Sequence, residues 1–266
     1  MCVYGGDNPQ WFRTAVDSIV NQTIKPNEVV LVVDGPVPEL LNEIICGYEK
    51  DPIFRVIRLE KNMGHGEARR IGLNACNHDL VALMDADDIS AFDRFEKQLK
   101  AFEENPDLTI VGSNITEFVD EPDNLVGART VFTTDEEIKA DMQKRCPMNQ
   151  VTVMFRKGVA DRVGGYIDWF CEEDYYLWLR LMLGGGVFAN IPENLVNVRV
   201  GKEMYQRRGG MKYFKSEAKL QKWMLQKKII GFGTYTVNVT KRLIVQVLLP
   251  NRIRGWVFQK FARKPV

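Results

Sequence analysis

Two hydrophobic patterns alternate along the first two-fifths of the chain. Apolar runs of strand length lie at residues 28–33, 54–59, 80–84 and 108–111. The stretches between them carry apolar residues at helical spacing, and these predict helices at residues 12–20, 39–49, 66–76 and 91–104. Asn8 and Pro9 mark the start of the first helix, because asparagine caps helix N-termini and proline fits the first turn.

This order of strands and helices predicts an α/β fold with a Rossmann-like, mostly parallel sheet flanked by helices. In such sheets, ligands bind at the carboxyl ends of the strands. The residues that directly follow the strands are therefore expected to form the functional site. They are Asp34, Asn62 and residues 85–88.

The regular alternation ends near residue 113. The later pattern predicts strands at 152–155, 188–191 and 195–200, a buried helix at 174–183 and a basic amphipathic helix at 211–229. We predict two parts, a catalytic domain over residues 1–210 and a basic, amphipathic helical C-terminal extension over residues 211–266.

Charge is divided unevenly between the two ends of the chain. The chain holds 36 Lys and Arg against 35 Asp and Glu, which gives a formal net charge of +1. No acidic residue follows Glu217, whereas residues 218–266 carry 11 basic residues. Such an asymmetry indicates two different surroundings for body and tail. The near-zero total argues against a nucleic-acid binder.

The remaining composition, 45% apolar and 27% charged, is typical of a globular protein. No apolar run approaches about 18 residues and no signal peptide is visible, so neither a transmembrane helix nor a secretion signal is expected. The five cysteines lack a Cys-x-x-Cys pair, which is typical of reduced thiols in a cytoplasmic protein. With only two histidines, a histidine-rich metal site is excluded.

An Asp-x-Asp pair, Asp85 and Asp87, follows the apolar run at 80–84. Side chains alternate along extended backbone, so both carboxylates are expected to point the same way while Ala86 packs inward. Two carboxylates at the mouth of a strand suit a hard divalent cation that also binds phosphate. On local evidence alone, the pair also fits a solvated loop that caps the next helix.

Two turns carry further candidates for nucleotide binding. Asp34 ends the second apolar run, where its carboxylate can accept hydrogen bonds from a uracil base or a ribose. Asn62 and Gly64 precede a helix, and glycines there let backbone amides approach a nucleotide. The alternative for both is that Asp34 and the Asn62–Gly64 segment only stabilise turns. We interpret His65 as a turn residue.

Two charged motifs lie in the second half of the chain. Glu173 and Asp174 stand at the start of the predicted helix at 174–183, whose N-terminus favours the ionised carboxylate that a base requires. Arg207 and Arg208 precede two glycines, and arginine binds phosphate in a bidentate manner. The alternatives are helix capping for the acidic motif and a basic surface turn for the other.

Taken together, these motifs resemble family 2 glycosyltransferases with the GT-A nucleotide-sugar-binding fold. The resemblance is to bacterial enzymes of capsule, exopolysaccharide and O-antigen assembly, of the amylovoran-biosynthesis type, and covers nearly the whole chain. It rests on residues 3–4, 17–22, 32–35, 62–64, 84–90, 93–98, 152–157, 164–166, 173–178 and 207–210. It implies inverting transfer of a sugar from a nucleotide-diphosphate sugar, usually a UDP-sugar, to a hydroxyl of a glycan or lipid-linked acceptor.

The resemblance implies roles at the donor end. Tyr4 and Asp34 hold the base and ribose of the nucleotide. Asp85 lies near the ribose and the metal, and Asp87 binds Mg²⁺ or Mn²⁺ on the diphosphate. Relatives begin with several more apolar residues before the position of Tyr4, which implies either an earlier start or a shortened first strand with a weakened pocket.

At the acceptor end, Asp174 matches the carboxylate that deprotonates the acceptor hydroxyl, with Glu173 beside it. Arg207 and Arg208 help to bind the diphosphate or close over it. Relatives often carry histidine where this chain has Gln150, so acceptor specificity is expected to differ if that position touches the acceptor.

The tail mixes basic residues with aromatic and aliphatic ones, and apolar residues 253, 256, 257 and 261 fall at helical spacing. Basic amphipathic helices of this kind lie in the headgroup region of anionic membranes. We therefore expect a cytoplasmic protein that is peripheral to the inner face of the plasma membrane. The alternative is that the apolar stripe packs on the domain; nucleic-acid binding is disfavoured by its apolar content.

Two other functions fit part of the pattern. A sugar nucleotidyltransferase also combines a parallel sheet with carboxylate-bound Mg²⁺, but the glycine- and arginine-rich signature for a triphosphate is missing near the N-terminus. A non-catalytic nucleotide-sugar-binding relative would keep the fold alone, and the retention of every acidic candidate argues against it.

Overall fold

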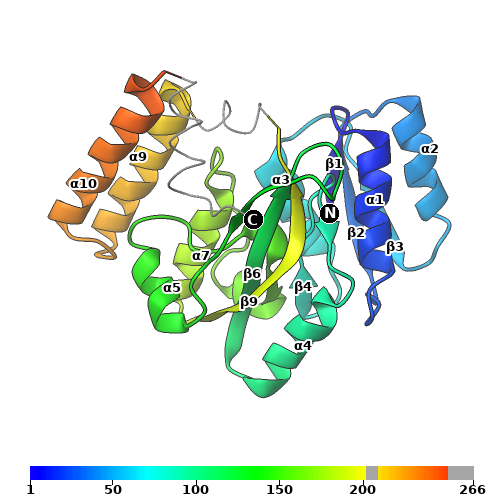
Figure 1. Ribbon diagram of the computed structural model, residues 1–266, viewed down its shortest axis with the longest axis horizontal. Coiled ribbons are helices and arrows are strands. Elements are labelled where there is room, and N and C mark those ends of the chain that lie inside the picture. Colours follow the sequence, from blue (N-terminus) through cyan, green and yellow to red (C-terminus); the bar gives the residue numbers. More distant parts are fainter. Residues whose placement is uncertain (202–208, 251–266) are drawn as a thin grey trace.

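A parallel sheet forms the N-terminal side of the computed structural model, which describes residues 1–201 and 209–250. Its strands are β1 (Cys2–Tyr4), β2 (Val29–Asp34) and β3 (Phe54–Arg58), in that order. Tyr4 pairs with Asp34, so β1 and β2 end side by side. The first two helices, α1 (Pro9–Val20) and α2 (Glu39–Tyr48), lie together beside this sheet (Figure 1).

The second sheet is mixed. It contains β4 (Leu80–Ala82), β8 (Met154–Arg156), β6 (Leu108–Phe118), β9 (Val187–Arg199) and β5 (Ile89–Ser90), and β7 (Leu125–Arg129) pairs with β6. Among the described strands of this sheet, β6 and β9 pair in parallel, and the other pairs are antiparallel, including β8 with both β4 and β6. The predicted α/β class with a Rossmann-like parallel sheet is confirmed, and its parallel order is broken after β3.

Helices flank both sheets. The remaining α-helices of the described residues are α3 (His65–Ala75), α4 (Arg94–Glu104), α5 (Asp135–Asp141), α6 (Lys157–Arg162), α7 (Glu173–Leu183), α9 (Met211–Gln226) and α10 (Phe232–Leu243), with a π-helical turn at Ile244–Leu248. Asn8 caps α1 as predicted, since its Oδ1 accepts hydrogen bonds from the backbone N–H groups of Gln10 and Trp11 at 2.9 and 3.2 Å.

Several strands differ from the sequence prediction. β4 ends at Ala82 rather than at residue 84, and β8 begins at Met154 because Gln150–Thr152 form a 3₁₀-helical turn. The run predicted to end at residue 111 continues to Phe118, because buried polar residues, including Ser113 and Asn114, extend β6. The two strands predicted at 188–191 and 195–200 are one strand, β9. Its pairing with β6 jumps from Ile191 to Asn194, so the two residues between them form a bulge rather than a break.

The described part of the tail shares the largest apolar core. Leu220 and Met224 of α9 are fully buried in the same cluster as Trp178 of α7. The ring of Trp223 also packs edge-on against Tyr176, with ring centroids 4.9 Å apart. Each buried aliphatic side chain of this size contributes about 1.5–3 kcal/mol to folding. The predicted amphipathic helix is therefore present as α9, with its apolar face on α7.

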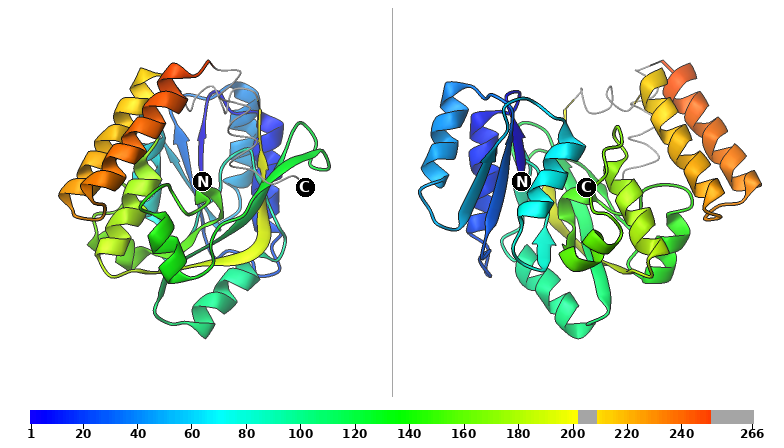
Figure 2. Two further views of the ribbon diagram at one scale, coloured as in Figure 1. Left: turned by 60° about the vertical axis from the view of Figure 1, so that its left-hand side comes forward. Right: turned by 180° about the vertical axis from the view of Figure 1, so that it is seen from behind.

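The helices α9 and α10 lie side by side at one end of the molecule, and α1 and α2 lie at the other (Figures 1 and 2). Within residues 1–201 and 209–250, none of the helices combines the length and apolarity needed to cross a membrane. The stripe predicted at 253–261 lies outside the described residues, and the boundary predicted after residue 210 stays a prediction.

Candidate active site

A polar pocket of about 370 Å³ opens where β1 and β2 end. Six predicted site residues line it together: Tyr4, Asp34, Asn62, Gly64, Asp85 and Asp87. They come from the ends of β1 and β2 and from the turns after β3 and β4. A second pocket of about 410 Å³ lies between the start of β2 and β4, and its lining is mainly aliphatic. The acidic residues therefore single out the first pocket.

Asp34 organises the turn that follows β3. Its side chain is only 5% exposed, and its two oxygens accept hydrogen bonds from the N–H groups of Met63 at 2.6 Å and Gly64 at 3.1 Å. Gly64 has a φ of 87°, which favours glycine, and it directly precedes α3. The structural turn role of Asp34 is thus present, and it fixes the loop that lines the pocket.

The Asp-x-Asp segment has the alternating arrangement that its extended backbone predicts. Ala86 is 6% exposed and packs in the apolar cluster around β1 and β2, while Asp85 and Asp87 line the pocket. Asp88 is buried, and its Oδ1 accepts a 2.8 Å hydrogen bond from the N–H of Arg199. The segment is therefore anchored to β9 on one side and faces the pocket on the other.

A buried arginine connects this segment to the start of α7. The guanidinium of Arg69 in α3 lies 2.7 Å from Asp85 Oδ1 and 3.4 Å from Glu173 Oε1. Its side chain is 6% exposed. His65 Nδ1 lies 3.5 Å from the same Glu173 oxygen. Arg69 thus connects Asp85 in this pocket with Glu173 at the start of α7, and His65 lies beside them, although Glu173 itself is outside the pocket lining.

Burial and neighbouring charges shift the pKa values of Asp85, Asp87 and Glu173. Burial raises the pKa of Asp87 to about 6, with further contributions from Asp85 and Asp7. Burial also opposes ionisation of Asp85, but Arg69, together with His65 and the N-terminus, outweighs it and lowers the pKa. Burial and Asp174 raise the pKa of Glu173, more than Arg69 lowers it.

The acidic residues of the pocket suit a divalent cation. Asp85, Asp87 and Asp7 all line it, and Asp7 and Asp85 both raise the pKa of Asp87. Carboxylate oxygens are the ligands that Mg²⁺ and Mn²⁺ prefer, and a cation relieves this crowding. No cluster of three metal-ligating side chains occurs within residues 1–201 and 209–250. Asp85 and Asp87 therefore offer two carboxylates to a cation that would take its other ligands from outside the protein.

The remaining predicted residues are placed only in part. Asp174 lies in the first turn of α7, where its Oδ1 is 2.6 Å from the N–H of Tyr175. Arg207 and Arg208 lie outside the described residues.

Three residues that the sequence interpretation missed belong to this site: Asp7, Arg69 and Arg199. His65, interpreted from the sequence as a turn residue, is the first residue of α3 and lines the pocket. Arg69 carried a readable signal, because it shares the buried face of α3 with Gly66 and Leu73 at helical spacing. Arg199 stacks between the rings of Trp11 and Phe118, at 4.4 and 4.5 Å from their centroids. Its position depends on contacts distant in sequence, which no local pattern reveals.

Comparison with known proteins identifies the family of the chain. The family model described as glycosyl transferase family 2 matches residues 1–164. The chain belongs to glycosyl transferase family 2. The match includes the pocket and the Asp-x-Asp segment, and it ends before α7.

Three relatives of this family 2 transferase align over nearly its whole length. An uncharacterised glycosyltransferase of Haemophilus influenzae is 38% identical over 99% of this chain and 98% of its own. The UDP-Gal:alpha-D-GlcNAc-diphosphoundecaprenol beta-1,3-galactosyltransferase of Escherichia coli is 36% identical over 99% and 95%. The amylovoran biosynthesis glycosyltransferase AmsE of Erwinia amylovora is 34% identical over 97% and 96%.

Solved structures share the GT-A fold of the transferase at low identity. Residues 1–349 of S. aureus TarS, in complex with UDP-GlcNAc, give a TM-score of 0.67 at 13% identity, over 97% of this chain and 74% of that one. The mannosyltransferase PcManGT of Pyrobaculum calidifontis, with GDP-Man and Mn²⁺, gives 0.62 at 14% identity, over 95% and 70%. The transferase spans 42% of the longer TarS chain.

Proposed function

We propose that this transferase moves a sugar from a UDP-sugar to a hydroxyl of a lipid-linked glycan, with inversion at the anomeric carbon and with a divalent cation. The observation that carries the proposal is the Asp85–Arg69–Glu173 chain, which connects the Asp-x-Asp pocket to the acidic start of α7. The Escherichia coli galactosyltransferase and AmsE support assignment to bacterial surface polysaccharide synthesis.

At the donor end, Tyr4 and Asp34 hold the base and ribose, beside the loop that contains Asn62 and Gly64. Tyr4 is 46% exposed and is available to a base. Asp85 and Asp87 hold the cation, which offsets the charge that develops on the leaving diphosphate. Arg207 and Arg208 are proposed to bind the same diphosphate.

At the acceptor end, Asp174 is proposed to accept the proton of the attacking hydroxyl. It lies at the N-terminus of α7, where the helix favours an ionised carboxylate. Glu173 has a raised pKa and is engaged by Arg69, so its role is to hold the turn beside the donor pocket. A single base and a leaving diphosphate in line with it suffice for one displacement with inversion.

The test is a transfer assay with Mn²⁺, UDP-galactose, UDP-glucose or UDP-GlcNAc, and a GlcNAc-diphospho-lipid acceptor. Asp87→Asn and Asp174→Asn are each expected to lower product formation by at least about 100-fold. Asp123→Asn, at an exposed position, serves as the matched control. Wild-type rates in both site variants would overturn the assignment.

We also propose that the tail contacts an anionic membrane, at the inner face of the plasma membrane. Lys212, Lys215, Lys219 and Lys222 are exposed at helical spacing along one face of α9. Each such lysine contributes about 1 kcal/mol to the free energy of binding to an anionic membrane surface. Sedimentation with phosphatidylglycerol vesicles at low and high salt tests the surface. Changing Lys215 and Lys222 to glutamine leaves the ring contacts of Lys212 and Lys219 in place and is expected to weaken binding, and unchanged binding would contradict the proposal.

A further inference from the structure

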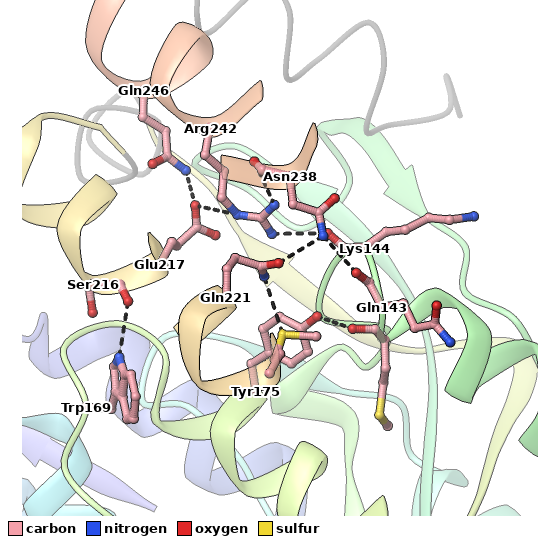
Figure 3. A network of polar contacts seen from close by, with 12 residues as sticks. Gln143, Lys144, Trp169, Tyr175, Ser216, Glu217, Gln221, Asn238, Arg242 and Gln246 are labelled. Carbon is pink, nitrogen blue, oxygen red and sulfur yellow. Dashed lines mark hydrogen bonds and ion pairs between the residues drawn. The ribbon is translucent and has the colours of Figure 1, made fainter. Parts of the chain in front are cut away.

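A helical hairpin beyond the family-model match packs against the helix that carries the acidic turn. The hairpin consists of α9 and α10, and the acidic turn is defined as residues 172–174 at the start of α7. Figure 3 shows a polar network between the hairpin and the segments on both sides of that turn. This network is separate from the Asp85–Arg69–Glu173 chain, which reaches the turn from the donor pocket.

The centre of the network is an ion pair between the two hairpin helices. Arg242 Nε of α10 lies 3.1 Å from Glu217 Oε2 of α9, and their side chains are 13% and 14% exposed. Gln246 Nε2 donates a hydrogen bond to the same oxygen of Glu217 (Figure 3). Neither charge of this buried pair is well solvated by water when its partner moves away. The two side chains therefore stay together in one geometry.

From this pair, α10 holds the backbone segment that follows α5. Arg242 Nη2 donates a 3.1 Å hydrogen bond to the carbonyl of Lys144, and Asn238 Nδ2 donates a 2.8 Å hydrogen bond to that of Gln143. The hydroxyl of Tyr175, in α7, donates to the carbonyl of Met142. Three successive carbonyls are thus bound, two by α10 and one by the helix of the acidic turn.

The other hairpin helix holds the loop that leads into the acidic turn. Trp169 Nε1 donates a 3.3 Å hydrogen bond to the carbonyl of Ser216, and Ser216 Oγ donates a 2.6 Å hydrogen bond to the carbonyl of Phe170. Lys212 and Lys219 lie over the rings of Phe170 and Trp169, at 4.0 and 4.5 Å from the centroids. The acidic turn is therefore held from both sides by the same hairpin.

The charges of Glu217 and Arg242 also affect the pKa of Glu172 in the acidic turn. Glu172 is 4% exposed, and burial, Glu217 and Asp174 raise its pKa, whereas Arg242 lowers it. The charged and titratable groups around Glu172 are Glu217 of α9, Arg242 of α10, Glu173, Asp174 and Tyr175 of α7, and Cys146 from the segment after α5. Within residues 1–201 and 209–250, Arg129 of β7 lies beside Cys146, and Arg242 is the cation that lowers the pKa of Glu172, so the loss of Arg242 and the loss of Glu217 have opposite electrostatic effects on Glu172.

We propose that Arg242 and Glu217 are positioning residues for sugar transfer: their ion pair clamps the two segments that flank the acidic turn and fixes Asp174 relative to the donor pocket. This rests on the proposed function, in which Asp174 is the acceptor base. A displacement of about 1 Å at a reacting group lowers the rate by as much as about 100-fold. The clamp acts on catalysis without contact to either substrate.

The test compares Arg242→Met, Arg242→Lys and Glu217→Gln in the UDP-galactose transfer assay across pH. Arg242→Met is expected to lower kcat by about 10- to 100-fold with the donor KM unchanged, and lysine is expected to restore part of the loss. The acidic limb of the kcat profile is expected to move to higher pH in Arg242→Met and to lower pH in Glu217→Gln. Lys241→Met, at an exposed neighbouring position, is the matched control.

A double variant and a hydrogen-exchange measurement distinguish loss of the clamp from misfolding and from absence of activity. The double variant Glu217→Gln/Arg242→Met leaves no unpaired charge and is expected to fold, because replacing a whole buried pair is often nearly neutral. Hydrogen exchange needs no substrate, and residues 142–146 and 168–173 are expected to exchange faster in this variant than in the wild type.

The results separate the two proposals. Unchanged hydrogen exchange in both segments of the double variant overturns the clamp, whether or not the wild type transfers sugar. Absence of sugar transfer by the wild type, taken alone, contradicts only the proposed function. In an active protein, shifts of the acidic limb in the same direction for both single variants, or kcat values within twofold of wild type, also overturn it.

Discussion

Arg69→Met is expected to lower the free energy of unfolding more than a substitution of an exposed neighbouring residue. The guanidinium is 6% exposed and lies 2.7 Å from Asp85 and 3.4 Å from Glu173. At an effective dielectric constant of about 20, these separations correspond to attractions of about 6 and 5 kcal/mol. Most of this attraction offsets the desolvation of the three charges, so it is not the net effect.

The net effect follows from what Arg69→Met leaves behind. Breaking a buried pair typically destabilises a protein by about 3–5 kcal/mol. Asp85 is 34% exposed, so water partly solvates the orphaned carboxylate and we expect the lower end, about 3 kcal/mol. Arg70→Met is the matched control, because Arg70 is 44% exposed and pairs only on the surface with Glu67. Its loss is expected to change the free energy of unfolding by less than about 0.5 kcal/mol.

Urea titration at several pH values measures the difference. Arg69 lowers the pKa of Asp85 in the folded state, so this pair stabilises the protein above the unfolded-state pKa and loses its effect as pH falls through the folded-state pKa. The penalty of Arg69→Met is therefore expected to be full at pH 7 and to shrink below about pH 4. A penalty at pH 7 within about 0.5 kcal/mol of that of Arg70→Met would refute the reasoning.

Three further predictions follow from other parts of the structure. Asn8→Ala removes the cap of α1 and is expected to lower the free energy of unfolding by about 1 kcal/mol in urea titration; no change would contradict the capping role. Gly112→Ala places a Cβ against Asn190 Oδ1 and 2.9 Å from Met148 Cε, and thermal unfolding is expected to show a loss of about 1–3 kcal/mol; an unchanged Tm would contradict this crowding. EDTA is expected to stop sugar transfer and Mn²⁺ to restore it, whereas full activity after exhaustive chelation would exclude the proposed role of the cation.

The sequence predicts most of the elements that place the donor pocket. Residues 29–33 are a continuous apolar run that ends at Asp34, so both β2 and the position of its terminal carboxylate can be predicted. Ala86 between two aspartates likewise indicates which side chains face outward, and the structure has this arrangement. These features are readable because they depend on spacing within a few residues.

The remaining features depend on contacts between distant parts of the chain. The second half of β6 carries buried polar residues such as Ser113, whose N–H is bonded to Thr152 Oγ1 at 2.9 Å, so hydrophobicity does not reveal it. The role of Arg69 is visible only when Glu173, 104 positions later, lies beside it. The Glu217–Arg242 pair joins two helices that composition alone describes as a basic tail.

The most direct test of the assignment is a donor screen with the full chain, Mn²⁺ and a lipid-diphosphate saccharide acceptor, in which nucleotide release and the glycosylated lipid are measured together. The proposed function predicts release of UDP from a UDP-sugar in proportion to new glycolipid of inverted anomeric configuration, and the loss of both in Asp87→Asn. Absence of transfer from every UDP-, GDP- and dTDP-sugar, or a product with retained configuration, would contradict it.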